Sequence, residues 1–145
     1  MKKRFAVKAQ VGVEYMIIVG FVTVAIISIL GFAYFYSNQI KDQIKANQLE
    51  SFATQLINSA ESVFFSGEPS KTTISLYLPE GVESIVIAPA LAPDSIVITT
   101  QTSSGKDIQA FRSKVPISGT ITSTGGIKKL SIEAQASDVL ISQVS

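Results

Sequence analysis

One run of apolar residues near the N-terminus limits what this chain can fold into. From Tyr15 to Tyr36 the sequence passes through 22 residues without an Asp, Glu, Lys or Arg. That is longer than the roughly 18 residues that indicate a membrane-spanning helix. The run therefore excludes an ordinary soluble globule and predicts a helix that crosses a membrane or lies among other apolar helices.

Composition removes most catalytic chemistries. Of the 145 residues, 46% are hydrophobic and 16% are charged, and histidine and cysteine are both absent. The chain therefore has no thiolate or imidazole ligand for a metal, no Cys/His or Ser-His-Asp catalytic site and no disulfide. Its formal net charge of +1 gives no basic surplus for nucleic acid. We expect no enzyme activity, no cofactor, no metal site and no nucleic-acid partner.

A basic cluster precedes the apolar run and predicts the orientation of the chain. Lys2, Lys3, Arg4 and Lys8 lie within the first nine residues. Positive charge at this end of a span stays in the cytoplasm, so the remainder of the chain is expected outside. A secretory signal peptide has a shorter apolar core, about 7 to 15 residues, and is cut after it. We therefore expect either an uncut anchor or a cut on the cytoplasmic side that removes residues 1–9.

A short motif lies at the boundary between the basic cluster and the apolar run. Gln10 and Glu14 are four residues apart, and Gly12 lies midway between them. The motif resembles the class III signal peptide of archaeal type IV pilin-like proteins, which usually has Ser at the position of Gly12 and Leu at that of Ile18. The resemblance implies that a prepilin-type peptidase cleaves between Ala9 and Gln10.

The same resemblance implies that Gln10 and Glu14 act in assembly. In related pilins a Glu at this spacing meets the free N-terminal amine of a neighbouring subunit. Inserting a carboxylate at the bilayer centre costs about 2.5 to 3.5 kcal/mol of free energy. A carboxylate in the first turn of a helix is stabilised by roughly 0.3 to 1 kcal/mol, which offsets part of this cost. The alternative is that Glu14 is only an interfacial residue flanking the span. The amine of Gln10 either stays free or cyclises to pyroglutamate, which leaves an amide N–H as the donor.

Residues 37–66 predict an amphipathic helix that continues the span. Gly67 and Pro69 mark its end. Counted from Val11 to Phe65, the whole helix has about 55 residues and a length of roughly 80 Å, more than a bilayer requires. We expect its second half to pack on a sheet of the same chain. Its apolar residues recur mostly at intervals of three or four: Ile40, Ile44, Leu49, Phe52, Leu56, Ala60, Val63 and Phe64.

Residues 70–145 predict a β-rich head. Short alternating runs are separated by turn residues, which indicates an antiparallel sheet or a small β-sandwich. Lys128 and Lys129 are expected on solvated faces or as protection of a sheet edge, and the acidic residues are too sparse to form a paired site. The expected strands are 73–78, 82–88, 95–102, 108–112, 115–118, 119–122, 127–135 and 139–144. The fold class predicted for the chain is α+β.

These features predict four parts: a cleaved basic leader (1–9), an apolar transmembrane or filament-core helix (10–36), an amphipathic spine helix (37–66) and an extracytoplasmic head (70–145). The resemblance implies a structural subunit of an archaeal type IV-like adhesive surface filament, membrane-inserted as a precursor. Its implied partners are copies of itself or related pilins, the prepilin peptidase and the pilus assembly machinery. The alternative is a single-pass anchored β-domain that binds a ligand or surface without forming filaments.

Overall fold

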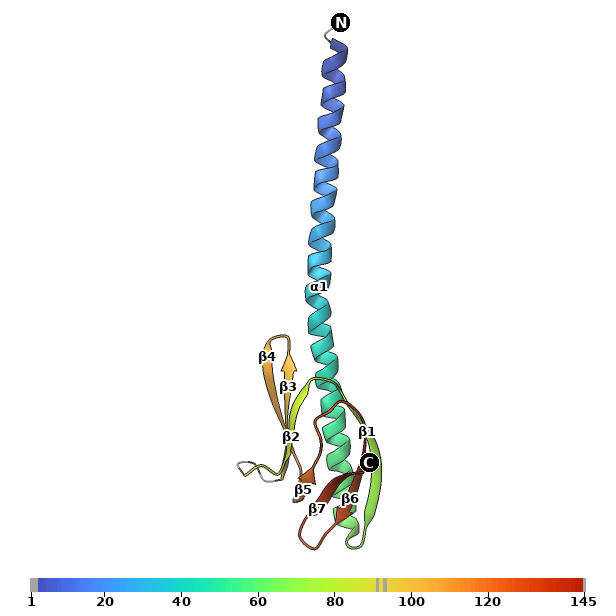
Figure 1. Cartoon of the computed structure of the whole chain (residues 1–145), viewed down its shortest axis with the longest axis vertical. Helices are drawn as coiled ribbons and strands as arrows, with labels where there is room; N and C mark the ends of the chain where they lie inside the picture. The colour runs from blue at the N-terminus through green and yellow to red at the C-terminus, as the bar shows by residue number, and fades with distance from the viewer. Residues whose placement is uncertain (1–2, 91, 93, 145) are drawn as a thin grey trace. The chain divides into compact units, whose positions relative to one another are not determined.

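The chain folds into one long helix followed by seven strands (Figure 1). The computed structural model describes the backbone of residues 3–90, 92 and 94–144, and their side chains from residue 12 onward. The predicted α+β class is confirmed. The elements are α1 (Lys3–Ser66), β1 (Lys71–Leu78), β2 (Val82–Ile87), β3 (Ser95–Thr102), β4 (Gly105–Arg112), β5 (Ile117–Thr120), β6 (Gly126–Ala134) and β7 (Val139–Val144).

Helix α1 begins earlier than the sequence analysis expected. Its backbone is helical from Lys3, whereas the predicted start was Val11. The residues between them contain neither Pro nor Gly, so nothing in this stretch interrupts a helix. At the other end, Gly67 has a φ of 74°, and its N–H donates to the carbonyl oxygen of Phe64 at 3.0 Å. A left-handed glycine of this kind commonly ends a helix.

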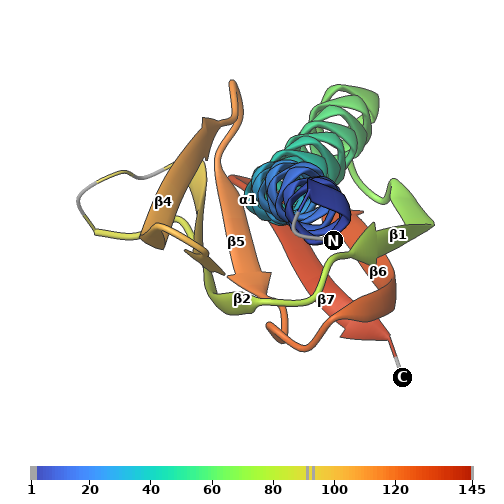
Figure 2. The same ribbon diagram turned by 90° about the horizontal axis from the view of Figure 1, so that it is seen from above.

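The chain divides into two compact units, Met1–Ile40 and Lys41–Ser145, and α1 contributes to both. In the second unit the strands flank residues 41–66 of α1 (Figure 2). Leu49, Phe52 and Leu56 of the helix are almost completely buried, as their spacing of three and four predicts. The sheets supply the other side of this core through Leu76, Leu78, Ile96, Ile98, Leu130, Ile132, Val139 and Ile141.

The strands form two sheets with different topologies. One has four strands in the order β1-β6-β7-β5, and the other has three in the order β2-β3-β4. All neighbours are antiparallel except β5 and β7, which are parallel. Strand β7, the last strand, lies between β5 and β6, and it runs parallel to β5 and antiparallel to β6. The predicted all-antiparallel arrangement is therefore wrong at this one pair.

Two predicted strand boundaries are also corrected. Residues 115–118 and 119–122 were expected as separate strands, but they contribute a single short strand, β5. Gly119 lies inside it with a φ of 128°, and a Cβ there would approach the carbonyl oxygen of Ile141 to 1.9 Å. Strand β4 starts at Gly105 rather than Ile108, because Lys106 and Asp107 continue the pairing with β3.

The burial pattern predicts that the helix is part of the head's core. We expect a fragment of residues 41–145 to fold by itself, and Leu56→Ala to lower its free energy of unfolding by about 2 to 5 kcal/mol. Leu56 has 0% of its surface exposed, so the substitution leaves a cavity. The neighbouring Gln55→Ala, on the exposed face, should change stability by less than about 0.5 kcal/mol. Urea denaturation followed by circular dichroism measures both, and equal effects would contradict the packing.

Candidate functional site

The apolar part of α1 is the strongest functional feature among the described residues. A window of this helix has a mean hydropathy of 2.7 and none of it is buried. It is long and apolar enough to cross a membrane. Phe21, Ile29 and Phe32 expose most of their surface, and the large aliphatic side chains around them are exposed as well. This segment can therefore serve as a membrane anchor, and its apolar surface requires cover from outside the described part of the chain.

Two hydroxyl groups inside the apolar segment are satisfied within the helix itself. The hydroxyl of Thr23 donates to the carbonyl oxygen of Val19 at 2.7 Å, and that of Ser28 donates to the carbonyl oxygen of Val24 at 2.8 Å. An unsatisfied hydroxyl in an apolar medium would cost free energy. These two hydroxyls therefore oppose neither lipid nor a bundle of similar helices as the surroundings of the segment.

Glycines leave open space at three positions along the surface of this helix. A Cβ placed on Gly12, Gly20 or Gly31 would meet no heavy atom within 4 Å among those described. Gly20 and Gly31 are eleven residues apart, which is close to three helical turns, so they lie on the same side. Small residues let membrane helices approach closely. The surface is compatible with helix packing, although glycine is also frequent in membrane helices generally.

The predicted assembly residues all lie in α1. Glu14 is exposed and forms no ion pair with any side chain in the described range. Ala9 and Gln10 have helical backbone, but their side chains fall outside the described residues. Because α1 starts at Lys3, Glu14 is about three turns inside the helix of the full chain. The first-turn stabilisation expected for Glu14 is therefore absent from the uncut chain.

A polar contact joins α1 to the turn between β3 and β4. The backbone N–H of Ser103 donates to Oδ2 of Asp42 at 3.1 Å, and the Ser103 hydroxyl donates to the same oxygen. These two hydrogen bonds, the hydroxyl's first, lower the pKa of Asp42 below its ordinary value, and the charge of Lys45 adds a smaller effect. The contact fixes the β3–β4 turn against the helix just beyond the apolar segment.

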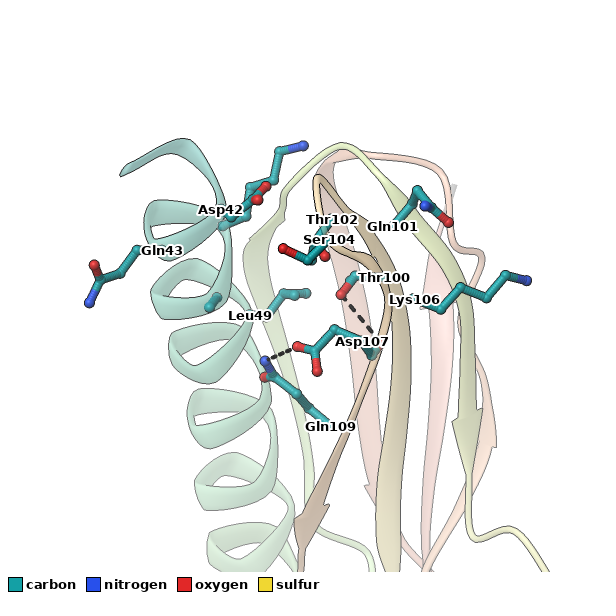
Figure 3. A pocket seen from close by; sticks show the side chains of 12 residues that line it. Asp42, Gln43, Leu49, Thr100, Gln101, Thr102, Ser104, Lys106, Asp107 and Gln109 are labelled. Carbon is teal, nitrogen blue, oxygen red and sulfur yellow. Dashed lines mark hydrogen bonds between the residues drawn. The ribbon is translucent and has the colours of Figure 1, made fainter. Parts of the chain in front are cut away.

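An open cleft of about 400 Å³ lies beside this contact (Figure 3). In it, Nε2 of Gln109 donates to Oδ2 of Asp107 at 2.7 Å. Its lining has charges of both signs and no aromatic side chain on which a sugar or base could stack. The lining residues are Asp42, Gln43, Lys45, Ala46, Leu49, Thr100, Gln101, Thr102, Ser104, Lys106, Asp107 and Gln109.

The expectation that Lys128 is solvated is wrong. Only 6% of its surface is exposed, because the alternation of β6 places it on the inner face with Leu130. Its Nζ donates to the hydroxyl oxygens of Thr122 and Thr124 at 2.8 and 2.7 Å. The Thr122 hydroxyl donates in turn to Oε1 of Gln143 at 2.7 Å. The network attaches residues 122–124 to β6 and β7, a structural role that the period-two pattern alone could have indicated.

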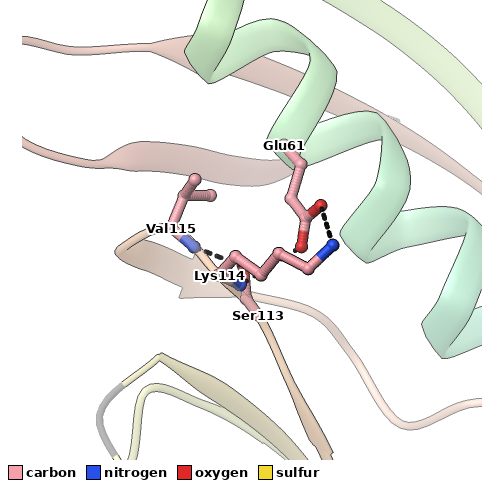
Figure 4. A network of polar contacts seen from close by, with 4 residues as sticks. All are labelled: Glu61, Ser113, Lys114 and Val115. Carbon is pink, nitrogen blue, oxygen red and sulfur yellow. Dashed lines mark hydrogen bonds and ion pairs between the residues drawn. The ribbon is translucent and has the colours of Figure 1, made fainter.

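A second polar contact attaches the segment before β5 to α1 (Figure 4). The backbone N–H of Lys114 donates to Oε1 of Glu61 at 3.2 Å, and its Nζ lies 3.6 Å from Oε2. The Lys114 side chain is 82% exposed, so the ion pair adds little stability. Within the described residues there is no group of three or more acidic side chains that could hold a metal ion.

Comparison with known proteins adds no identification. No family model, curated protein or solved structure matches the chain.

The Asp42 contact predicts a pH dependence. Because the pKa of Asp42 is lowered in the folded protein, its stabilising effect is complete above the ordinary aspartate pKa and is lost as the pH falls through the lowered value. Ser103→Ala should raise the pKa of Asp42 toward the ordinary range. Ser104→Ala, which removes the next hydroxyl along the chain, should not. Carboxyl-carbon NMR of Asp42 during acid titration measures this, and identical curves for both variants would refute the assignment.

Proposed function

We propose that this chain is a structural subunit of an archaeal type IV-like surface filament, assembled through its N-terminal helix and serving adhesion. One observation supports this most: the first part of α1 is apolar and exposed, while its later part is the core of the head. A helix of this kind needs a covering that its own described residues do not provide. The motif formed by Gln10, Gly12 and Glu14 favours copies of the same helix as that covering.

The proposed pathway has a membrane precursor and an extracellular product. The basic leader stays in the cytoplasm while the head lies outside. A prepilin peptidase cuts between Ala9 and Gln10, which removes four cations and changes the formal net charge from +1 to −3. The assembly machinery then moves the apolar segment from lipid into the filament core. This exchange changes the hydrophobic free energy little, since acyl chains and apolar helices are similar surroundings.

Cleavage would also change the electrostatics at Glu14. In the uncut chain the free N–H groups of the first helical turn lie near Lys3, far along the helix from this carboxylate. After cleavage Gln10 would be the first residue, and the free N–H groups and the new terminal amine would lie within about one turn of Glu14. Trimming thus creates the positive end that a carboxylate in an apolar filament core requires.

The proposed role requires no chemistry from the head. We propose that the chain is not an enzyme and that it needs no cofactor, since its function would be assembly and contact. The partners would be copies of itself or related pilins, the peptidase and the assembly machinery. Nucleic acid is not among the proposed partners, because the head has two aromatic residues, Tyr77 and Phe111, and no basic surplus.

The first prediction of this proposal concerns the mature N-terminus. Protein from the native surface fraction should begin at Gln10, as a free amine or as pyroglutamate, and electron microscopy of that fraction should show fibres. Intact mass spectrometry separates the two forms of Gln10. Ala9→Leu, which enlarges the residue before the cut, should leave an uncut precursor in the membrane. Filaments whose subunits still begin at Met1 would contradict the processing.

The second prediction concerns Glu14. Glu14→Val should leave membrane insertion intact but reduce the filament yield at least tenfold, because the loss of a charge-assisted hydrogen bond costs about 1.5 to 3 kcal/mol. Glu14→Gln keeps an acceptor and should have a smaller effect. Ile18→Val, a small change farther along the same helix, serves as the control. Yields are compared by sedimentation of sheared surface material, and an unchanged yield for Glu14→Val would remove its assembly role.

The second candidate function is an anchored binding module. The open cleft of about 400 Å³ beside Asp42 and Asp107 is the observation that favours it, because its lining carries charges of both signs that could contact a polar ligand. This alternative predicts single molecules in the membrane that retain residues 1–9. The analysis of the mature N-terminus therefore decides between the two functions.

A further inference from the structure

The peptide bond that the proposed peptidase cuts lies inside a helix. Helix α1 begins at Lys3 and continues far beyond the bond between Ala9 and Gln10. In an α-helix each N–H donates to the carbonyl oxygen four residues earlier. The N–H groups of residues 10–13 therefore donate to the carbonyl oxygens of residues 6–9, across the scissile bond. These hydrogen bonds hold its two sides in place.

A helical peptide bond is a poor substrate for a peptidase. Its carbonyl carbon is packed between neighbouring turns, and cleavage of folded chains proceeds through locally unfolded states. Where opening and closing are fast, the rate of cleavage follows the equilibrium population of the open state. The N-terminal end of α1 must therefore unwind past Ala9 and Gln10 before the cut.

Gly12 lies within the segment that must unwind. By the helical pattern its N–H pairs with the carbonyl oxygen of Lys8, across the scissile bond. Glycine in a helix interior favours the unfolded chain, because it loses more conformational freedom on folding than any other residue. A Cβ at this position would meet no heavy atom within 4 Å among those described, so packing within the described chain does not require the glycine. Gly12 thus lowers the free-energy cost of opening the helix at the place of the cut.

The apolar segment limits how far this opening extends. From Tyr15 to Tyr36 the chain has no charged residue, and backbone groups in a bilayer core find no water to replace a broken hydrogen bond. Unwinding the span therefore costs much more free energy than unwinding the basic end. The opening is confined to the residues before the span, which include Gly12 but not Gly20 or Gly31.

We propose that Gly12 is a positioning residue for cleavage: it allows the basic end of α1 to unwind, so that the peptidase reaches the bond between Ala9 and Gln10. This inference rests on the proposed function and concerns its processing step. The glycine has this effect only in the uncut chain. Once residues 1–9 are removed, Gly12 lies in the first turn of the helix, where N–H groups have no intrahelical partner in any case. The mature subunit therefore keeps a stable helix.

The test compares glycine-to-alanine substitutions at two positions of the full-length precursor. Gly12→Ala should slow the release of residues 1–9 about two- to fivefold, which is the fold-change equivalent to the roughly 0.5 to 1 kcal/mol of helix stability that this exchange adds. Gly20→Ala makes the same exchange beyond the opening segment, also with no described atom within 4 Å of the new Cβ, and should leave the rate unchanged. Gly12→Ser should give an intermediate rate, because the helix propensity of serine lies between those of alanine and glycine. Mass spectrometry measures the rates in membranes that contain the prepilin-type peptidase.

Two further measurements separate helix opening from a contact between the peptidase and residue 12. Adding Ala6→Gly to Gly12→Ala should restore part of the lost rate, because it weakens the helix on the other side of the cut. Hydrogen exchange of the precursor in detergent micelles, without peptidase, reports the opening directly. The backbone amides of residues 10–13 should exchange more slowly in Gly12→Ala than in the wild type, by about the same factor as the rates of cleavage.

The outcomes separate this inference from the proposed function. Equal rates for the wild type and Gly12→Ala would overturn the role of Gly12 and leave the processing intact; a lower filament yield at an equal rate would assign Gly12 to helix packing instead. Slower cleavage without a change in hydrogen exchange, or without rescue by Ala6→Gly, would indicate a contact with the peptidase and would also overturn it. A wild-type precursor that is never cut would refute the processing itself, and this inference with it.

Discussion

No described residue covers the apolar segment of α1, so this segment must be covered by something outside the described chain. This requirement decides the surroundings in which the whole molecule can exist. The large apolar side chains of the segment are exposed, and the hydroxyls of Thr23 and Ser28 are bonded within the helix. The hydrophobic effect penalises such a surface in water but hardly distinguishes lipid from a bundle of apolar helices. The segment is therefore stable in either surroundings, and a subunit that moves from membrane to filament needs this property. A polar group left unsatisfied in the span would have opposed the transfer.

The same helix has a different task in its second half. Between Leu49 and Leu56 the apolar residues fall on one side and form the centre of the head's core, while Gln55 and its neighbours on the other side stay exposed. The strands would leave this core open without residues 41–66, because the sheets provide only the opposing side chains. One continuous helix therefore forms part of the head's core in its second half and carries the apolar segment in its first half.

The sequence was sufficient to predict the parts of the fold that depend on local pattern. The charge-free run from Tyr15, the helical spacing of Leu49, Phe52 and Leu56, and the glycine at the helix end each have a direct structural consequence. The parallel pairing of β5 with β7 is a long-range choice that no short pattern contains. The period-two pattern of β6 could have indicated that Lys128 is buried, but its partners, Thr122 and Thr124, lie on a neighbouring segment that no local pattern identifies. The Asp42 contact with Ser103 joins residues 61 positions apart, which is likewise invisible locally. The motif at Gln10 and Glu14 came from resemblance, and its role stays a prediction.

In the proposed filament, affinity and register would come from different parts of the chain. Apolar contacts among the helices are strong in total but non-directional, so they tolerate a shift of one subunit along another. A carboxylate such as Glu14 does not tolerate such a shift, because it must stay beside a donor in an apolar core. Only 16% of the residues of this chain are charged. If one subunit shifts along another, a charged side chain that loses its partner therefore finds few other charges nearby, so each pair helps to fix the register. Subunits can thus assemble in a single register even though most of the helix surface is apolar and would allow several.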